Sequence, residues 1–311
     1  MNYIYRIYSD ITHHHPSSLP LPSSPPPPSP PPPLLSSPPS PPLLSTNHLP
    51  DASGMVKLWH YPTATCLATI SEKRQTLSIE VNPDRTKLLT TGSDALIHVY
   101  DLETRQLINT CGTSDSQQLM DGHKFRVFAA QYHPATQNTF ISGGWDNTVQ
   151  YWDDRNPHSF RHFTGPHICG DSLDIDASTN QILTGSWRRT DILQIWDFLT
   201  GAKIHDVPQN MDDTSSLYCA QWLGEDSIVS GGSSKNMAQV HNRTTLNVIG
   251  KLTNLPKAVY CIDNDHLGLD ATIAIGFDCY IYLVKSERTG EVRVMTPEST
   301  TVRAYSVNND F

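Results

Sequence analysis

The sequence predicts an all-β fold, and two features carry that prediction. The first is a series of short runs in which apolar and polar residues alternate, separated by turn residues and without helical periodicity, as in LSIEVNPD at residues 77–84. The second is an internal repeat of eleven residues, which occurs without a gap as TTGSDALIHVY at 90–100, SGGWDNTVQYW at 142–152 and AIGFDCYIYLV at 274–284. Each copy has an Asp four positions after its first residue and ends in an alternating strand.

Two looser copies and one partial copy extend the series. The segment TGSWRRTDILQIW at residues 184–196 is two residues longer, SGGSSKNMAQVH at 230–241 is one residue longer, and MVKLW at 55–59 opens the series. Successive copies end 41 to 52 residues apart, and a further strand with a turn precedes the complete ones, as in FAAQYHPA at 128–135. A period of about 44 residues with four strands per unit predicts a β-propeller, in which each unit is one antiparallel blade.

From about residue 51 to residue 311 the chain resembles the WD-repeat family. Trp152-Asp153 and Trp196-Asp197 match the signature dipeptide of that family, and Gly122-His123 matches the Gly-His that opens a repeat. The resemblance supports the β-propeller of four-stranded blades that the repeat period predicts. It also implies a non-catalytic platform for binding other proteins, since a propeller presents its loops rather than a reaction centre.

One repeat has all four residues of the structural tetrad that the resemblance implies, namely His123, Ser142, Asp146 and Trp152. In that tetrad the carboxylate accepts from the imidazole, and the serine links the imidazole to the indole N–H. Such a buried network stabilises a fold only when every member is paired. A Ser-His-Asp catalytic triad is the alternative, but no feature of the sequence leaves this serine exposed in a cleft.

The chain contains five complete repeats and one partial repeat, whereas rings of the family usually have seven blades. The C-terminal segment TTVRAYSVNND at residues 300–310 resembles the first strand of a further blade. The resemblance implies that this strand joins the partial repeat in one composite blade, which would still lack a strand. We therefore expect a propeller over residues 49–311 whose ring the sequence does not show to be closed. The departures from the pattern, His241 and Val284 at tryptophan positions above all, predict less regular blades.

Residues 1–48 form a proline- and serine-rich tail. Sixteen of the 24 prolines lie between Pro16 and Pro50, and no Asp, Glu, Lys or Arg occurs between Asp10 and Asp51. Proline lacks an amide donor and has a fixed φ, so this composition predicts a disordered coil that adds nothing to a core. A docking ligand for SH3 or WW modules is the alternative, but no basic residue flanks its P-x-x-P motifs. The triplet of histidines at residues 13–15 has no fixed geometry for a metal.

Composition argues against several classes of function. The 311 residues carry a net charge of −9, which disfavours nucleic acid or an anionic membrane surface as the primary partner. Six widely spaced cysteines without a C-x-x-C motif indicate mostly buried, reduced thiols. Residues 1–15 have no signal-peptide core and no stretch approaches 18 apolar residues, which predicts an intracellular protein, cytoplasmic or nuclear, that is not secreted. Without phosphate-loop, G-x-S-x-G or H-E-x-x-H motifs, we expect no enzyme, cofactor or metal site.

The turn between the second and third strands of each blade is the predicted binding region. The family uses the residue before the tetrad Asp for recognition, and the longer turn at residues 184–196 adds to it. Five residues are predicted to form one partner-binding face: Trp145, Trp187, Arg188, Arg189 and Phe277. Trp and Arg dominate binding hot spots, and the two arginines favour an acidic or phosphorylated peptide. Packing of the tryptophans against neighbouring blades is the alternative.

A second prediction concerns residues 140–155, FISGGWDNTVQYWDDR, which resemble the box of WD-repeat substrate receptors in cullin-type ubiquitin ligases. The match ends in Trp152-Asp153-Asp154-Arg155, and the resemblance implies that Asp153 and Arg155 dock the ligase adaptor. The main hypothesis remains a scaffold or adaptor that binds proteins or peptides within a larger complex. The ligase receptor and an enzyme on a propeller fold are the alternatives.

Deletion of residues 1–48 tests the prediction for the tail. The free energy of unfolding should change by less than about 0.5 kcal/mol, because a polyproline coil makes no core contacts. Urea unfolding of the full and the shortened chain measures the difference, and a larger loss of stability would mean that the tail completes a blade.

Overall fold

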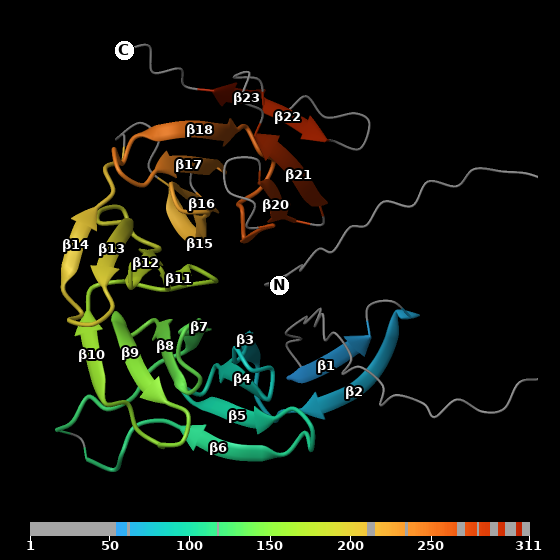
Figure 1. Cartoon of the computed structure of the whole chain (residues 1–311), viewed down its shortest axis with the longest axis vertical. Helices are drawn as coiled ribbons and strands as arrows, with labels where there is room; N and C mark the ends of the chain where they lie inside the picture. Colours follow the sequence, from blue (N-terminus) through green and yellow to red (C-terminus); the bar gives the residue numbers. More distant parts are fainter. Residues whose placement is uncertain are drawn as a thin grey trace, which may run out of the picture.

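The computed structural model describes residues 54–60, 63–116, 118–209, 215–233, 236–265, 271–278, 280–286, 292–295 and 303–306. Within them the regular elements are β-strands, which form antiparallel sheets. Figure 1 shows the sheets following one another in chain order around an arc. The proline-rich tail, with its histidine triplet, and Cys279 lie outside the described residues.

Four blades are meanders whose strands pair in sequence order. The first consists of β3 (Thr76–Val81), β4 (Lys87–Gly92), β5 (Ile97–Asp101) and β6 (Leu107–Cys111). The second consists of β7 (Val127–Tyr132), β8 (Thr139–Gly144), β9 (Thr148–Asp153) and β10 (Arg161–Thr164). The third consists of β11 (Leu173–Asp176), β12 (Gln181–Gly185), β13 (Leu193–Asp197) and β14 (Lys203–Asp206). The fourth consists of β15 (Ser216–Leu223), β16 (Ser227–Ser233), β17 (Ala238–Asn242) and β18 (Val248–Thr253).

The fifth blade and a partial blade complete the set. The fifth consists of β19 (Cys261–Asn264), β20 (Thr272–Phe277), β21 (Tyr280–Ser286) and β22 (Val292–Met295). The partial blade is the two-stranded sheet of β1 (Met55–His60) and β2 (Thr65–Ser71). The architecture is thus the predicted one of five four-stranded blades with a partial blade at the start.

The register shows which strands the partial blade contains. The ladder between β1 and β2 shifts between Leu58 and Trp59. The same shift separates Val99 from Tyr100 and Ile195 from Trp196, where third strands pair with fourth strands. β1 and β2 are therefore the third and fourth strands of their blade.

The C-terminal strand corrects one expectation. We predicted that it would join the partial blade, but β23 (Arg303–Ser306) pairs antiparallel with β18, as a fifth strand at the edge of the fourth blade. An antiparallel ladder needs only an open row of backbone donors and acceptors. The sequence of this strand therefore does not decide which edge it uses.

The core lies between consecutive sheets. Val149 and Tyr151 on β9 are fully buried in one cluster with Ile175 and Trp196 of the third blade. On the other face of the second sheet, Trp152 packs in a separate cluster with Val99 of the first blade. Each sheet in the middle of the series thus buries both faces, and each large apolar side chain removed from water contributes about 1.5–3 kcal/mol.

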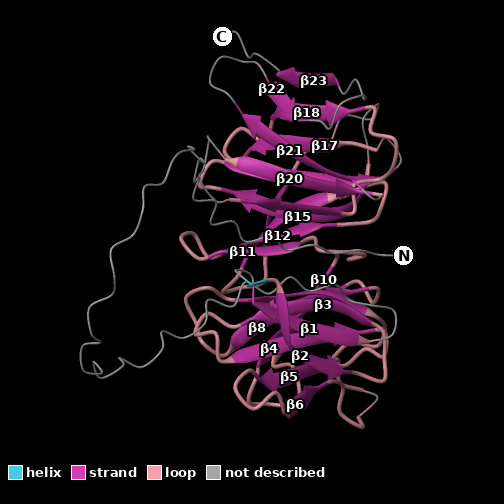
Figure 2. Ribbon diagram, turned by 90° about the vertical axis from the view of Figure 1, so that its right-hand side faces the viewer, coloured by secondary structure: helices cyan, strands magenta, loops and turns pink. Residues whose placement is uncertain are grey.

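The strands also position the turns. In the side view the strands run across the molecule and their connections gather along its two sides (Figure 2). The turns β4–β5, β8–β9, β12–β13, β16–β17 and β20–β21 all join a second strand to a third strand. Because each blade repeats one meander, these turns emerge at the same side of the ring.

Candidate protein-binding face

The turn between β8 and β9 is held by the four residues of the expected tetrad. His123 Nδ1 lies 2.8 Å from Asp146 Oδ2, and His123 Nε2 lies 2.7 Å from the Ser142 hydroxyl, which also accepts from Trp152 Nε1 at 2.7 Å. The carboxylate of Asp146 also accepts from the hydroxyl of Thr148 at 2.8 Å. Burial raises the pKa of Asp146, but hydrogen bonds from His123 and Thr148 hold it below its ordinary value.

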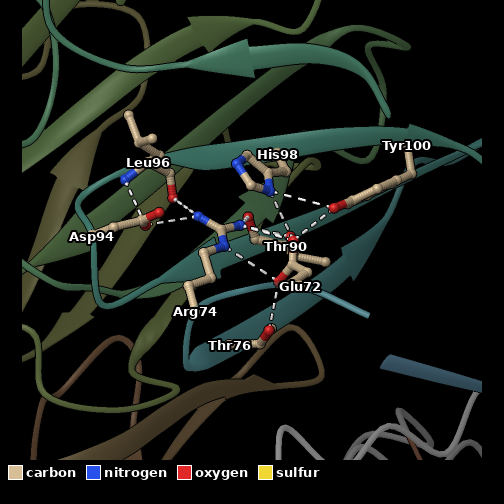
Figure 3. A network of polar contacts seen from close by, with 8 residues as sticks. All are labelled: Glu72, Arg74, Thr76, Thr90, Asp94, Leu96, His98 and Tyr100. Atoms are coloured by element: carbon tan, nitrogen blue, oxygen red, sulfur yellow. Dashed lines mark hydrogen bonds and ion pairs between the residues drawn. The ribbon is translucent and has the colours of Figure 1, made fainter. Parts of the chain in front are cut away.

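The corresponding turn of the first blade, between β4 and β5, is held by a carboxylate instead of an imidazole (Figure 3). Glu72 lies four residues before β3, as His123 lies four residues before β7. Its Oε1 accepts from the hydroxyls of Thr90 at 2.6 Å and Tyr100 at 2.8 Å, and Nδ1 of His98 lies 2.8 Å away. Thr90 and Tyr100 occupy the positions of Ser142 and Trp152 in the repeat.

Arg74 completes this network by joining it to the turn. Its guanidinium lies 3.1 Å from Glu72 Oε1 and 2.8 Å from Asp94 Oδ1, and it donates to the carbonyl of Leu96 at 2.7 Å. Asp94 is the counterpart of Asp146, so a Glu–Arg–Asp chain replaces the His–Asp pair. The sequence analysis did not identify this substitute. The signal was present as an acidic residue four positions before the strand, with an arginine two positions later.

The pKa of Glu72 reflects its burial, its hydrogen bonds and the neighbouring positive charge. Burial would raise it, but hydrogen bonds from His98, Thr76 and Thr90 and the positive charge of Arg74 hold it well below the ordinary range. Glu72 is therefore a buried carboxylate that stays ionised because every face of it meets a donor.

Trp145 lies in the β8–β9 turn that the tetrad supports, with 42% of its surface exposed. Its ring stacks on Phe128 at 5.2 Å between centroids, and the Arg126 guanidinium lies 5.4 Å from the ring centre. Its indole N–H donates to the sulfur of Cys169 at 3.1 Å, in the loop that leads to the third blade. The ring is therefore held by stacking and by its N–H edge, and less than half of the side chain is exposed to solvent.

Trp187 lies in the neighbouring turn between β12 and β13, with 45% of its surface exposed. Arg188 in the same turn donates to the side chain of Asn147 in the β8–β9 turn at 2.9 Å, which joins the two turns directly. Arg189 is exposed. The structure thus brings Trp145, Trp187 and the two arginines together on adjacent turns.

The loop before β7 adds three residues that the sequence analysis missed. Lys124, Phe125 and Arg126 are exposed, and the carbonyl of Arg126 accepts from the amide of Trp145. The tryptophan face is defined here as these side chains together with those on the two turns: Lys124, Phe125, Arg126, Trp145, Trp187, Arg188 and Arg189. Asp191, in the β12–β13 turn, is an exposed acidic neighbour.

Phe277 does not belong to this face. We predicted it in a turn, but it is the last residue of β20, paired with Tyr280, and only 2% of it is exposed. Its ring packs edge-on against Tyr282, with 4.6 Å between centroids. The two repeats are equally long, but the β20–β21 ladder extends to the pair Phe277–Tyr280, whereas the β8–β9 ladder ends at the pair Gly143–Val149. The residue aligned with Trp145 therefore lies inside the ladder and packs in the core.

Arg155, the predicted adaptor-docking residue, lies at the opposite end of β9 from Trp145. Its side chain is 67% exposed, and it donates from Nε and Nη2 to the two carboxylate oxygens of Asp153 at 2.8 and 2.5 Å. These bonds raise the pKa of Arg155 and lower that of Asp153. The box residues thus form a bidentate pair with each other.

Comparisons with known proteins agree with this architecture. The family model of the WD domain, G-beta repeat, matches residues 114–153, which span the tetrad. The chain contains a WD repeat and folds as a β-propeller. A chain of a mitotic checkpoint complex structure is similar in fold, with a TM-score of 0.62 and 17% identity over 80% of this chain and 72% of that one.

Two curated proteins are similar to part of the chain. The ribosome biogenesis protein ytm1 of Pyrenophora tritici-repentis is 26% identical over 189 residues, which cover 58% of this chain and 33% of that protein. The WD repeat-containing protein 25 of Mus musculus is 29% identical over 48% of this chain and 27% of that protein. The propeller therefore matches about a third or less of the length of these relatives.

Among the described residues, no group of three His, Cys, Asp or Glu side chains could hold a metal ion. No helix there is long and apolar enough to cross a membrane. Of the described cysteines, Cys66 is exposed, the other four are buried, and none of them forms a disulfide.

Replacement of Asp146 by alanine tests the tetrad. We expect a loss of about 1–3 kcal/mol in the free energy of unfolding, because His123 and backbone donors lose their acceptor. Asp84→Ala, in an exposed turn, is the control and should change stability by less than about 0.5 kcal/mol. Equal melting temperatures for the Asp146 variant and the native chain would contradict the assignment.

The pH dependence of stability tests Glu72. Its pKa is lowered by folding from an unfolded value of about 4.3, so it stabilises the fold above that pH, and the contribution is lost as the pH falls toward the folded pKa. We expect Glu72→Gln to be the less stable chain at neutral pH. The difference should shrink by about 1.5 kcal/mol between about pH 4.3 and pH 3. The exposed Glu103→Gln should show no such trend in urea unfolding; a pH-independent difference for Glu72→Gln would refute the role of its charge.

Proposed function

We propose that this WD-repeat propeller is a non-catalytic scaffold that binds an acidic protein segment on the tryptophan face. The observation that carries the proposal is the exposure of Trp145 and Trp187 on two turns that Arg188 and Asn147 tie together. Large aromatic rings left in water contribute binding energy when a partner covers them. The strand pairing within the blades does not depend on the exposure of either tryptophan ring.

The charge of the face supports an acidic partner. Four basic side chains, Lys124, Arg126, Arg188 and Arg189, surround the two tryptophans in a chain whose net charge is −9. A cluster of positive charge on a negatively charged protein attracts carboxylates or phosphates, and guanidinium groups bind both in a bidentate manner. A segment with acidic residues next to apolar ones would match the mixture of charge and aromatic surface.

The relatives support an assembly role rather than a reaction. One carries ribosome biogenesis in its name, and the fold itself occurs in a mitotic checkpoint complex. We propose that this propeller is likewise an intracellular subunit of a larger protein complex, and that it uses neither a metal nor a cofactor. The Asp153–Arg155 pair lies at the far end of the blade and is not needed for this function.

Replacement of Trp187 and Arg188 by alanine tests the face. We expect the double variant to retain its circular dichroism spectrum and to lose at least tenfold in affinity for peptides selected from an array of acidic, phosphorylated, neutral and basic sequences. Binding by the native chain should favour the acidic members and weaken with salt, because exposed charges are screened.

The matched control is Arg155→Ala with Phe160→Ala. This pair also combines an exposed arginine with an exposed aromatic residue, but it lies on the connection between β9 and β10, at the opposite side. Undiminished binding in the control and loss in the Trp187 variant is the expected result. Equal loss in both variants, or a preference for RNA over acidic peptides, would refute the proposed function.

A further inference from the structure

The two turns of the tryptophan face meet at one side chain. Oδ1 of Asn147, in the β8–β9 turn, accepts from Nη2 of Arg188 at 2.9 Å and lies 2.8 Å from Nδ1 of His167. His167 belongs to the loop between β10 and β11, which also contacts both tryptophans. The carbonyl of His167 accepts from the amide of Trp187, and a cysteine sulfur of the same loop accepts from the indole N–H of Trp145. His167 and Arg188 are thus held next to each other on the tryptophan face.

The contact with Asn147 fixes where the proton of neutral His167 lies. A guanidinium only donates hydrogen bonds, so the side-chain atom of Asn147 that Arg188 contacts is the oxygen. Nδ1 of His167 contacts the same oxygen and therefore carries a hydrogen. Nε2 then gains a hydrogen only when the ring is protonated. Within the described part of the chain Nε2 makes no hydrogen bond, and it is not buried, so a ligand can reach it.

The positive charges around this histidine are not neutralised by neighbouring carboxylates. Four basic side chains of the tryptophan face form no ion pair with a described acidic side chain: Lys124, Arg126, Arg188 and Arg189. Elsewhere in the propeller, five basic side chains are paired with carboxylates: Arg74, Lys87, Arg155, Lys203 and Arg243. The tryptophan face therefore keeps positive charge that a bound anion would neutralise.

The charged groups that act on His167 come from both turns. Burial and the positive charge of Arg188 lower the pKa of His167, and the negative charge of Asp146 in the β8–β9 turn raises it by a smaller amount. The net pKa lies below the ordinary value, so the ring is mostly neutral at pH 7 without a ligand.

We infer that His167 and Arg188 form a binding site for a phosphate monoester, the phosphothreonine or phosphoserine of a partner segment. The inference rests on the proposed function and deepens it, since it names phosphate rather than a carboxylate as the anion that binds where the two turns meet. Arg188 donates to the phosphate oxygens, and Nε2 of protonated His167 is a second donor. Asn147 is the positioning residue, because its oxygen contacts both side chains.

The charge of the ligand decides between phosphate and carboxylate. A phosphate monoester carries a charge of about −1.5 to −2 at pH 7 and three acceptor oxygens, whereas a carboxylate carries a single charge on two oxygens. Protonation of His167 beside Arg188 costs free energy, and the larger charge of the phosphate offsets more of that cost. A bound phosphate therefore raises the pKa of His167, and binding takes up a proton. Binding strengthens as the pH falls toward about 6, where the phosphate itself begins to lose charge.

Three fluorescein-labelled peptides test the site on the full chain. They share one sequence of leucine and aspartate residues and differ at the centre, which is phosphothreonine, threonine or glutamate. By fluorescence anisotropy we expect the phosphothreonine peptide to bind about tenfold more tightly than the glutamate peptide at pH 6.5. This preference should shrink about threefold at pH 7.5, because His167 then holds its proton less often.

Two variants and a matched control assign the effect to these residues. His167→Gln should reduce the preference for phosphothreonine and abolish its pH dependence. Asn147→Gly should also reduce the preference, since glycine readily adopts the positive φ of 60° at this position but does not hold the two side chains. The control His162→Gln, an exposed histidine on β10, should keep both the preference and its pH dependence.

A measurement on the native chain keeps the test independent of how the variants fold. Phenyl phosphate should raise the pKa of His167 in an NMR titration of its imidazole resonance, and benzoate at the same concentration should raise it less. An unchanged pKa with phenyl phosphate, equal affinities for the phosphothreonine and glutamate peptides, or a pH dependence that persists in His167→Gln would each overturn the inference.

The peptides also separate this inference from the proposed function. If the glutamate peptide binds as tightly as the phosphothreonine peptide, and Trp187→Ala with Arg188→Ala weakens both, the tryptophan face binds acidic segments and the phosphate site is refuted. If no peptide of the series and no acidic peptide of the array binds, the phosphate site and the proposed function are both refuted.

Discussion

The packing of consecutive sheets is the contact on which the rest of the propeller depends. A four-stranded blade has two apolar faces, and neither is buried until another blade covers it. Val149 and Tyr151 are removed from water only because the third blade packs on them, just as the second blade covers Val99. The arc in Figure 1 is the geometric result of this requirement, and its first and last sheets are where the requirement is not met.

The polar networks show a second constraint, which different residues satisfy in different blades. The turn before a third strand needs a buried hydrogen-bond acceptor and a second side chain that connects this acceptor to the strands. His123 and Asp146 supply these in the second blade, and Glu72 with Arg74 in the first. In the fourth blade His241 occupies the tryptophan position, fully buried, and burial lowers its pKa to about 4, so it packs there as a neutral ring.

An aromatic residue near a turn is buried or exposed according to its place inside or outside the strand ladder. Residues inside a ladder, such as Phe277, are drawn into the core, while residues in a longer turn, such as Trp187, remain in solvent. How far the ladder extends into the turn thus decides whether an aromatic ring is buried or exposed. The exposed rings lie on turns that a buried polar network or a hydrogen bond between the turns holds in place.

The sequence by itself determined the all-β class, the five complete repeats and the tetrad members, because period, strand alternation and turn residues are local properties of the chain. The exposure of Trp145 and Trp187 also followed from their turn positions. Tertiary structure alone decided that Glu72 and Arg74 replace a histidine, since that pairing joins side chains from three segments. It also decided that Phe277 is buried and that β23 pairs with β18. These outcomes depend on how far each ladder extends and on which strand edge lies nearby, and neither can be read from an alignment of repeats, because register is set by contacts between strands.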